Sequence, residues 1–198
     1  MTALMYRYPR LYELALKILH GKQLKKRYKI IAEKIGENKR VFEPGCGTAM
    51  IYPFLPRGCV YEGWDLNARF LAYCRKRGVR VFKKDIFDFT NYPESDVILI
   101  CDVLHHVIPR HESLVVEALK RTKKLIISEP AKSFKPPTLF MPIAVFLNYL
   151  IIDYDGINSP KTQLEWDYSK EKLNDFFQKL GCTETIDVGW DMIAVFNS

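Results

Sequence analysis

The sequence predicts an α/β fold, in which helices cover both faces of one mostly parallel β-sheet. Three observations predict it. Short apolar strands alternate with amphipathic helices along most of the chain, a glycine-rich turn follows the first strand, and the last two strands are close enough to form a hairpin. Alternation gives parallel strands, and the hairpin adds one antiparallel strand near the edge. We therefore expect a doubly wound sheet of seven strands.

Length and composition predict one soluble domain that comprises residues 1–198. The chain is 48% hydrophobic with interspersed charge, which is ordinary globular usage, and it is long enough for one sizeable core. Its five cysteines never form Cys-x-x-Cys, so neither a disulfide framework nor a metal site is indicated. Charged residues interrupt the N-terminal apolar run, which therefore lacks the uninterrupted core of a signal peptide. We expect a cytoplasmic protein.

Residues 1–36 predict a helical cover at the N-terminus. Apolar residues recur at helical spacing in two runs, and Gly36 ends the second run. The members of the two runs are Leu11, Leu14 and Ile18, then Tyr28, Ile31, Ala32 and Ile35. A basic cluster lies between them and consists of Lys22, Lys25, Lys26, Arg27 and Lys29. We interpret the cluster as a solvated helix face, while attraction of an anionic substrate, nucleic acid or a membrane surface stays open.

The first strand leads into the turn E-P-G-C-G-T-A, residues 43–49. Glycine lacks a Cβ, so a Gly-x-Gly turn after a strand can bring main-chain N–H groups against a ligand. A dinucleotide site would need a third glycine where Met50 stands, and no Gly-Lys-Ser/Thr run of a triphosphate site follows. Glu43 would repel a pyrophosphate but attract an ammonium or sulfonium group. The turn therefore favours a cationic amino-acid nucleoside.

The second strand ends on an acid, Asp65, twenty positions after Gly45. An acid at this spacing, at the tip of the neighbouring strand, would accept both hydroxyl groups of a ribose. Alone, Asp65 would be read as a turn or helix-capping residue, and the glycines as turn formers. Turn and acid together predict a nucleoside cofactor site.

Residues 43–49 resemble the first motif of class I S-adenosylmethionine-dependent methyltransferases, Asp/Glu-x-Gly-x-Gly-x-Gly/Ala, with Ala49 at its last position. Segments 60–67, 79–86 and 95–106 fit the second, third and fourth strands of the same family in order. The resemblance covers most of the chain from about Lys39 onward. It implies a Rossmann-like fold, S-adenosylmethionine as cofactor with S-adenosylhomocysteine as product, and methyl transfer as the activity.

The resemblance also implies a set of cofactor contacts. Asp65 would bind the ribose, Leu66 would contact the adenine ring, and Asp85 would accept from the adenine amino group. Cys101 and Asp102 would face the methionine end of the cofactor. The full implied set is Glu43, Gly45, Cys46, Gly47, Asp65, Leu66, Asp85, Ile86, Cys101 and Asp102.

Two histidines after the fourth strand are the candidates for catalysis. Methyl transfer is an in-line displacement that depends mainly on positioning, but an oxygen or nitrogen acceptor that begins protonated also gains from a base. Imidazole has a suitable pKa, and His105 and His106 follow the strand on the rim where the family places its acceptor; that both only cap or pack the loop stays open. His111 lies in the next helix, where we expect it to be exposed. Glu129, at the end of the fifth strand, is a second candidate for binding the acceptor or anchoring a lid.

The later elements complete the alternation. A helix with Leu114, Val115, Ala118 and Leu119 on one face precedes a buried strand at residues 125–128. Ser169 can cap the last helix, which ends at Gly181. Two closing strands are expected at residues 185–188 and 192–196.

Residues 131–167 interrupt this pattern, and the family commonly inserts its substrate cover there. Within them, residues 139–152 are apolar nearly all round but too short to span a bilayer. A buried lid, a wall over the methyl acceptor, and contact with a membrane or a second subunit all stay open.

The predicted function is methyl transfer from S-adenosylmethionine to an oxygen, nitrogen or carbon of a small, partly hydrophobic acceptor, with a lipid-derived acceptor left open. No Asn/Asp-Pro-Pro-Tyr/Phe loop follows the fourth strand, which disfavours adenine or glutamine amino groups as acceptors. The net charge of +7 and the pI near 9.1 keep two alternatives in view, an RNA-modifying methyltransferase and a non-catalytic cofactor-binding protein. The sequence does not determine the oligomeric state.

Overall fold

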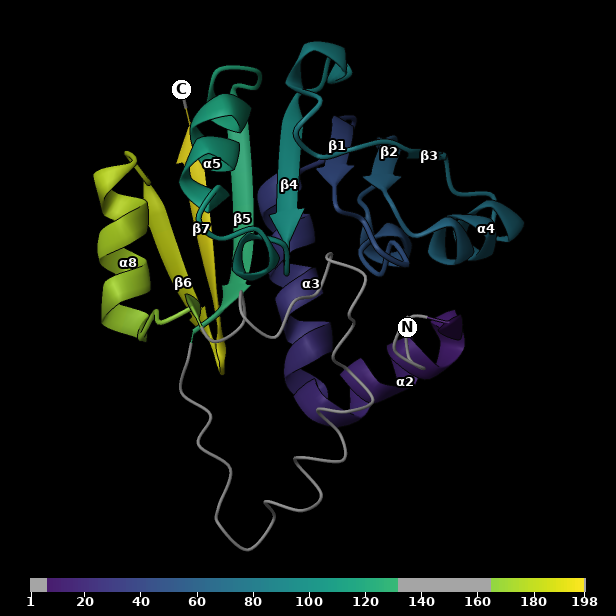
Figure 1. The fold of residues 1–198 in the computed structure, drawn as a ribbon, viewed down its shortest axis with the longest axis horizontal. Coiled ribbons are helices and arrows are strands. Elements are labelled where there is room, and N and C mark those ends of the chain that lie inside the picture. The colour runs from purple at the N-terminus through teal and green to yellow at the C-terminus, as the bar shows by residue number, and fades with distance from the viewer. Residues whose placement is uncertain (1–6, 132–164, 198) are drawn as a thin grey trace, which may run out of the picture.

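A seven-stranded sheet forms the centre of the protein, in the order β3-β2-β1-β4-β5-β7-β6 (Figure 1). The computed structural model describes residues 7–131 and 165–197. Strands β1 to β5 run parallel, while β7 is antiparallel to both β5 and β6. The strands are β1 (Arg40–Pro44), β2 (Val60–Asp65), β3 (Val81–Lys83), β4 (Val97–Cys101), β5 (Lys124–Pro130), β6 (Glu184–Val188) and β7 (Asp191–Asn197). The predicted doubly wound sheet with a closing hairpin is confirmed.

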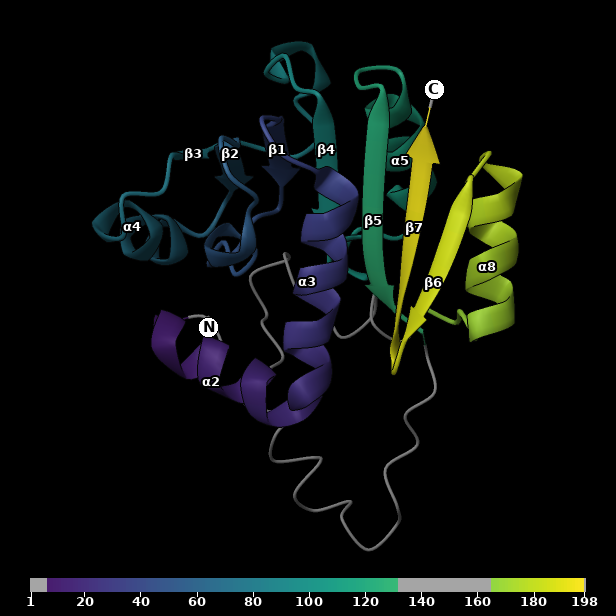
Figure 2. The same cartoon turned by 180° about the vertical axis from the view of Figure 1, so that it is seen from behind.

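Helices cover both faces of this sheet. Helix α3 lies behind the sheet in Figure 1 and in front of it in Figure 2, whereas α5 and α8 lie on the opposite face. The helices are α2 (Pro9–His20), α3 (Lys22–Ile35), α4 (Ala68–Lys76), α5 (His111–Leu119) and α8 (Lys170–Lys179). The described ranges also contain the short 3-10 helices η1 (Tyr52–Phe54), η2 (Phe89–Asn91) and η3 (Leu104–His106).

The alternation of side chains along the strands creates two cores. In β4, whose five residues are all buried, Leu99 joins the core beneath α3 and α4. Its neighbours Ile98 and Ile100 point the other way and pack with Leu114 of α5 and Phe177 of α8. A strand with both faces covered reads as a continuous apolar run, which is what the sequence shows there.

Local sequence signals set several helix ends. The Asn67 side chain accepts hydrogen bonds from the amides of Arg69 (3.0 Å) and Phe70 (3.3 Å) and caps α4. Ser169 Oγ accepts from the Lys172 amide at 3.3 Å and caps α8, as predicted. Helix α3 ends at Gly36, whose φ of 79° suits glycine.

Helix α2 has the opposite orientation to the one its apolar spacing predicts. Leu11, Leu14 and Ile18 are exposed, whereas Tyr12 and Leu16 face inward and line a cavity. The reversal arises because α2 carries apolar residues on both faces and extends past the sheet to cover the strand ends (Figure 1). The second predicted run, on α3, is buried as expected.

Helix α2 is attached to α4 by polar contacts. Glu13 pairs with Arg77 at 3.2 Å and accepts from the Tyr73 hydroxyl at 3.3 Å, and the rings of Tyr12 and Phe70 lie 5.0 Å apart. Through α4, the N-terminal cover therefore lies at the side of the sheet that carries β2 and β3.

The predicted insertion at residues 131–167 lies mostly outside the described residues, and so do the lid, substrate-wall and contact-surface predictions for residues 139–152. At its end, Trp166 is buried, and its indole Nε1 donates to the Pro130 carbonyl at 2.9 Å. Residue 166 therefore lies at the carboxyl end of β5. Within residues 7–131 and 165–197, no helix is long and apolar enough to cross a membrane.

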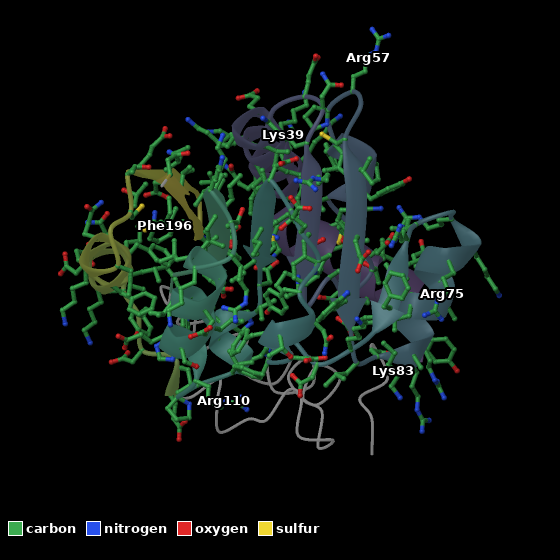
Figure 3. All side chains as sticks on the ribbon, turned by 90° about the horizontal axis from the view of Figure 1, so that it is seen from above. Lys39, Arg57, Arg75, Lys83, Arg110 and Phe196 are labelled. Carbon is green, nitrogen blue, oxygen red and sulfur yellow. The ribbon has the colours of Figure 1, made fainter. Side chains whose placement is uncertain are left out.

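Viewed from above, four of the labelled cations, Arg57, Arg75, Lys83 and Arg110, lie around the perimeter of the molecule, while Phe196 of β7 is buried (Figure 3). Part of the net positive charge is therefore spread around the rim rather than gathered near one element.

Candidate functional site

The carboxyl ends of β1, β2 and β4 meet at the edge of the sheet that α2 covers (Figure 1). Strands β1 and β4 are neighbours although two strands separate them in sequence, so the chain order reverses between them. In open α/β sheets, ligands bind outside the strand ends at such a reversal.

The glycine turn after β1 folds back onto the end of β2. The amides of Gly45 and Cys46 both donate to the Trp64 carbonyl, at 2.7 and 2.9 Å. Gly45 has a φ of 78°, and a Cβ at this position would lie 2.6 Å from a methyl carbon of Val103. Only glycine meets both conditions without strain.

Asp65 links this turn to the end of β2. One carboxylate oxygen accepts from the Gly47 amide at 2.8 Å, and the other accepts from the Asn67 amide at 2.7 Å. Burial raises the pKa of Asp65, although these backbone donors act in the opposite direction. The Leu66 amide is a third backbone donor to this carboxylate, so about one of its four lone-pair positions stays open to a ligand, and Leu66 itself is exposed. The predicted ribose and adenine contacts are thus adjacent.

Glu43 is buried at the end of β1, where its carboxylate accepts a hydrogen bond from the Tyr61 hydroxyl. Burial raises the pKa of Glu43 to about 8; the Tyr61 hydrogen bond opposes the shift, and the charges of Asp102 and Asp65 add to it. With this pKa Glu43 holds its proton at neutral pH, and a neighbouring cation would favour its ionised form. The attraction of a cation predicted for this residue stays a prediction.

Asp102 follows β4 and is held by an arginine from α3. Arg27 donates from Nη1 to Oδ1 of Asp102 at 2.9 Å and from Nη2 to Oδ2 at 2.6 Å, and its Nη1 lies 3.1 Å from Oδ1 of Asp191. Burial alone would raise the pKa of Asp102, but the charge and hydrogen bonds of Arg27 hold it below its ordinary value.

The interpretation of the basic cluster as a solvated face is therefore wrong for one of its members. The four lysines of the cluster are exposed, but Arg27 is completely buried, because its helix turns that position toward two carboxylates.

A small cavity of about 50 Å³ lies among these groups. Six of the predicted cofactor residues line this cavity, and side chains of α2 and α3 complete its wall. The six are Glu43, Gly45, Cys46, Gly47, Cys101 and Asp102. The lining residues from the two helices are Tyr12, Leu16 and Tyr28.

The other four predicted cofactor residues, Asp65, Leu66, Asp85 and Ile86, do not line this cavity. Asp65 adjoins it through its bond to the Gly47 amide, whereas Asp85 and Ile86 follow β3. Asp85 is exposed after β3, and its side chain accepts from the Phe87 amide at 2.9 Å within its own turn. The adenine contact implied for these two residues stays a prediction.

Glu129 organises the loop that carries the two candidate histidines. It is fully buried on β5; one of its carboxylate oxygens accepts from the Val103 and Leu104 amides at 2.7 and 2.8 Å, and the other lies 2.7 Å from Nδ1 of His105. Because Glu129 is fully buried and both of its oxygens have partners within the loop, it fixes the loop and the His105 ring; its predicted contact with the acceptor stays a prediction.

His105 and His106 have different electrostatic environments, although their rings lie 3.9 Å apart. Burial disfavours the charged form of His105, but Glu129 outweighs it, and the pKa of His105 lies above its ordinary value. Burial, with the charge of His105, lowers the pKa of His106 well below the ordinary value. With Nδ1 directed to Glu129, the neutral His105 ring presents Nε2 as its basic nitrogen.

His111 is not exposed as predicted. It is half-buried at the start of α5, where its Nε2 lies 2.8 Å from the Tyr168 hydroxyl, and burial lowers its pKa. Trp166 packs between two histidines, with ring centroids 6.1 Å from His105 and 6.0 Å from His111. Sequence spacing could not reveal this cluster, since Tyr168 is 57 positions from His111. Within the described ranges, no group of three or more metal-ligating side chains occurs.

Comparison with known proteins identifies the family. Residues 25–136 match the family model described as "Methionine biosynthesis protein MetW", which is more than half of the chain. The chain belongs to the MetW family. All the cofactor residues predicted from the sequence, together with Arg27, His105 and Glu129, lie inside the part that matches MetW, whereas Trp166, Tyr168 and Asp191 lie beyond it.

Curated relatives of this MetW-family chain include trans-aconitate 2-methyltransferases. The protein from Mycobacterium ulcerans (strain Agy99) is 29% identical over 92 residues, which are 44% of this chain and 35% of that protein. The probable enzyme of Mycobacterium tuberculosis (strain ATCC 25618 / H37Rv) is 32% identical over 81 residues, or 39% of this chain and 31% of the other. The alignments span about a third of the length of these relatives.

Solved structures show the same fold at low sequence identity. A DhpI–SAH complex has a TM-score of 0.68 at 14% identity and covers 96% of this chain and 91% of the other. A methyltransferase from Thermotoga maritima, described as a possible histamine N-methyltransferase, has a TM-score of 0.60 at 17% identity and covers 98% and 99%. The predicted fold, that of class I S-adenosylmethionine-dependent methyltransferases, is therefore confirmed for this MetW-family chain.

Proposed function

We propose that the protein is an S-adenosylmethionine-dependent methyltransferase that acts on a small, partly hydrophobic acceptor. The observation that carries the proposal is the bond between Asp65 and the Gly47 amide. The bond holds the Asp65 carboxylate, which can accept from a further donor, against the glycine turn after β1. The methyltransferase names of the curated relatives support the proposal. Their alignments are too short to carry their acceptor to this chain.

The residues present fit the cofactor. Asp65 offers acceptors for a ribose diol, and Leu66 offers an exposed apolar surface for a base. Glu43 and Asp102 line the cavity with acidic groups suited to the ammonium and sulfonium of a methionine part. The cavity of about 50 Å³ is much smaller than the roughly 300–1,000 Å³ of typical ligand pockets. We therefore expect the ligand to extend along the end of β2 and to displace α2 outward.

The bound cofactor would supply an electrophilic methyl group, and the chain would supply position and proton transfer. The strand ends and α2 would exclude water and fix the line of attack. His105 would accept a proton from the acceptor at Nε2, with Glu129 holding the ring and stabilising its charged form. His106 would stay neutral beside it, because burial and the neighbouring charge oppose its protonation.

A turnover assay tests this function. The purified protein would be incubated with S-adenosylmethionine and a panel of hydroxyl, amine and carboxylic-acid acceptors, and S-adenosylhomocysteine would be measured by mass spectrometry. We expect turnover with at least one acceptor and a loss of about 10²–10⁴-fold in His105→Gln, the usual contribution of a general base. His106→Gln is the matched control and should keep most activity. Binding without turnover on any acceptor would contradict the proposal and favour a non-catalytic role.

A further inference from the structure

We propose that Arg27 is a positioning residue for the cofactor, holding the Asp102 carboxylate so that its free lone pairs face the amino group of the methionine part. The inference rests on the proposed function and adds to it a residue that lies outside the motifs after β1, β2, β3 and β4. It also explains why a member of an otherwise exposed basic cluster is buried.

Arg27 grips Asp102 with a two-point contact. The two guanidinium nitrogens reach the two carboxylate oxygens at 2.9 and 2.6 Å, which fixes the plane of the carboxylate as well as its distance. The Asp102 amide donates to the Ser128 carbonyl at 2.9 Å. The residue is thus held at both its main chain and its side chain.

The two hydrogen bonds from Arg27 leave part of the Asp102 carboxylate accessible to a ligand. Its side chain is 25% exposed, while that of Arg27 is 0% exposed, and Asp102 lines the cavity. A carboxylate has about four lone-pair positions, and Arg27 occupies one on each oxygen. The Cys101 thiol lies 4.0 Å from Oδ2, so the position that remains on Oδ1 is the one that can accept from an ammonium group.

A second carboxylate fixes Arg27 itself. Asp191, which is 1% exposed at the start of β7, lies 3.1 Å from Arg27 and 3.4 Å from Nδ1 of His20. Arg27 is therefore held from α3, β4 and β7 at once. The guanidinium cannot follow Asp102 if that side chain rotates, so it acts as a rigid support.

The charges around the cavity also fit this role. One guanidinium faces the carboxylates of Asp102 and Asp191, with Glu43 on the same cavity wall. Arg27 offsets one of the two carboxylates that it faces, which leaves an excess of one negative charge at neutral pH, where Glu43, with its pKa raised to about 8, is mostly protonated. A ligand with an ammonium or sulfonium group offsets that excess.

Calorimetry with two ligands tests the inference. S-adenosylhomocysteine carries the amino-acid part, and 5′-methylthioadenosine carries the same nucleoside without it. In Arg27→Met we expect affinity for S-adenosylhomocysteine to fall about tenfold to hundredfold, which is the effect of losing a well-placed bond to a charged group. Affinity for 5′-methylthioadenosine should change less than about threefold. Loss of structure alone would weaken both ligands equally.

Two further variants keep the test decisive. Arg27→Lys keeps the positive charge but cannot make the two-point contact. It should therefore shift the ratio of the two affinities in the same direction as Arg27→Met, by a smaller factor. If Arg27→Met does not fold, Arg27→Lys tests the inference in its place. Arg40→Met is the matched control, because Arg40 pairs with Glu94 and Asp96 at the other end of β1.

The result that overturns the inference is an unchanged ratio of the two affinities in folded Arg27→Met or, failing that variant, in Arg27→Lys. Failure of cofactor binding, on which the proposed function depends, looks different, since the wild-type protein would then bind neither ligand. That outcome would overturn the inference with it. Binding without turnover would contradict the proposed function but leave this test intact.

Discussion

At the scale of single residues, Gly45 meets two requirements that no other residue type can satisfy together. Its φ is 78°, and a Cβ would lie 2.6 Å from Val103. Gly45→Ala should therefore lose about 1–2 kcal/mol through backbone strain and a further 1–3 kcal/mol or so through overpacking. Gly78→Ala is the control, because Gly78 has a similar φ of 75° but a Cβ there would meet nothing within 4 Å. Equal losses of unfolding free energy in urea would contradict the steric account.

Glu43 predicts a pH dependence of stability. Its pKa is about 8 in the fold, against an ordinary value of 4.5. Between these pH values the folded protein holds a proton that the unfolded chain has released, so stability falls as the pH rises through this window and levels above it. Glu43→Gln cannot titrate and should lack this decline. Urea unfolding of both proteins from pH 5 to pH 8 checks it, and parallel curves would show that Glu43 is not the cause.

Residues can be predicted where their partners are local, and not where the partners are distant. Asp65 follows the glycine turn at a known spacing, so its place beside Gly47 is readable from the chain. Arg27 finds Asp102 75 positions away, and no local pattern separates it from the lysines beside it. Glu129 is a candidate from the sequence, but its bonds to the η3 loop depend on the pairing of β4 with β5.

At the scale of elements, the attachment of α2 predicts a change in dynamics. Glu13→Gln removes the 3.2 Å ion pair with Arg77, a partly exposed contact worth about 1 kcal/mol or less, and leaves the bond from Arg77 to the Thr48 carbonyl in place. Hydrogen exchange in α2 should become faster by up to about fivefold, and S-adenosylhomocysteine should dissociate faster, because the helix covers the cavity. Lys34→Met is the control, since it breaks a similar pair with Glu184 that joins α3 to β6. Unchanged exchange in α2 would show that Glu13 and Arg77 do not hold the cover.

The elements themselves are largely readable from the sequence, since strands and helices differ in apolar period. The hairpin strands are expected at residues 185–188 and 192–196 and are found at Glu184–Val188 and Asp191–Asn197. The sequence does not predict which face of α2 is buried, because Tyr12 and Leu16 form a second apolar face beside Leu11, Leu14 and Ile18. Which face turns inward depends on where the helix docks, and that is set by α4.

At the scale of the whole molecule, the sheet order places the site. Alternation predicts parallel strands, and the reversal between β1 and β4 brings the glycine turn and Asp102 to one cavity. The sheet order does not determine the distribution of surface charge. The labelled Arg57, Arg75, Lys83 and Arg110 lie apart from one another around the molecule (Figure 3), so the net charge of +7 does not by itself indicate a nucleic-acid track.

The measurement that tests the account most directly is calorimetric binding of S-adenosylhomocysteine to the folded protein, with Asp65→Ala alongside. We predict saturable binding by the wild type at one site and at least about a tenfold loss in the variant, which lacks the acceptor of the ribose hydroxyls and of the Gly47 amide. Absence of binding by the folded wild type, or binding that Asp65→Ala leaves unchanged, would contradict the claim that the turn after β1 is a cofactor site.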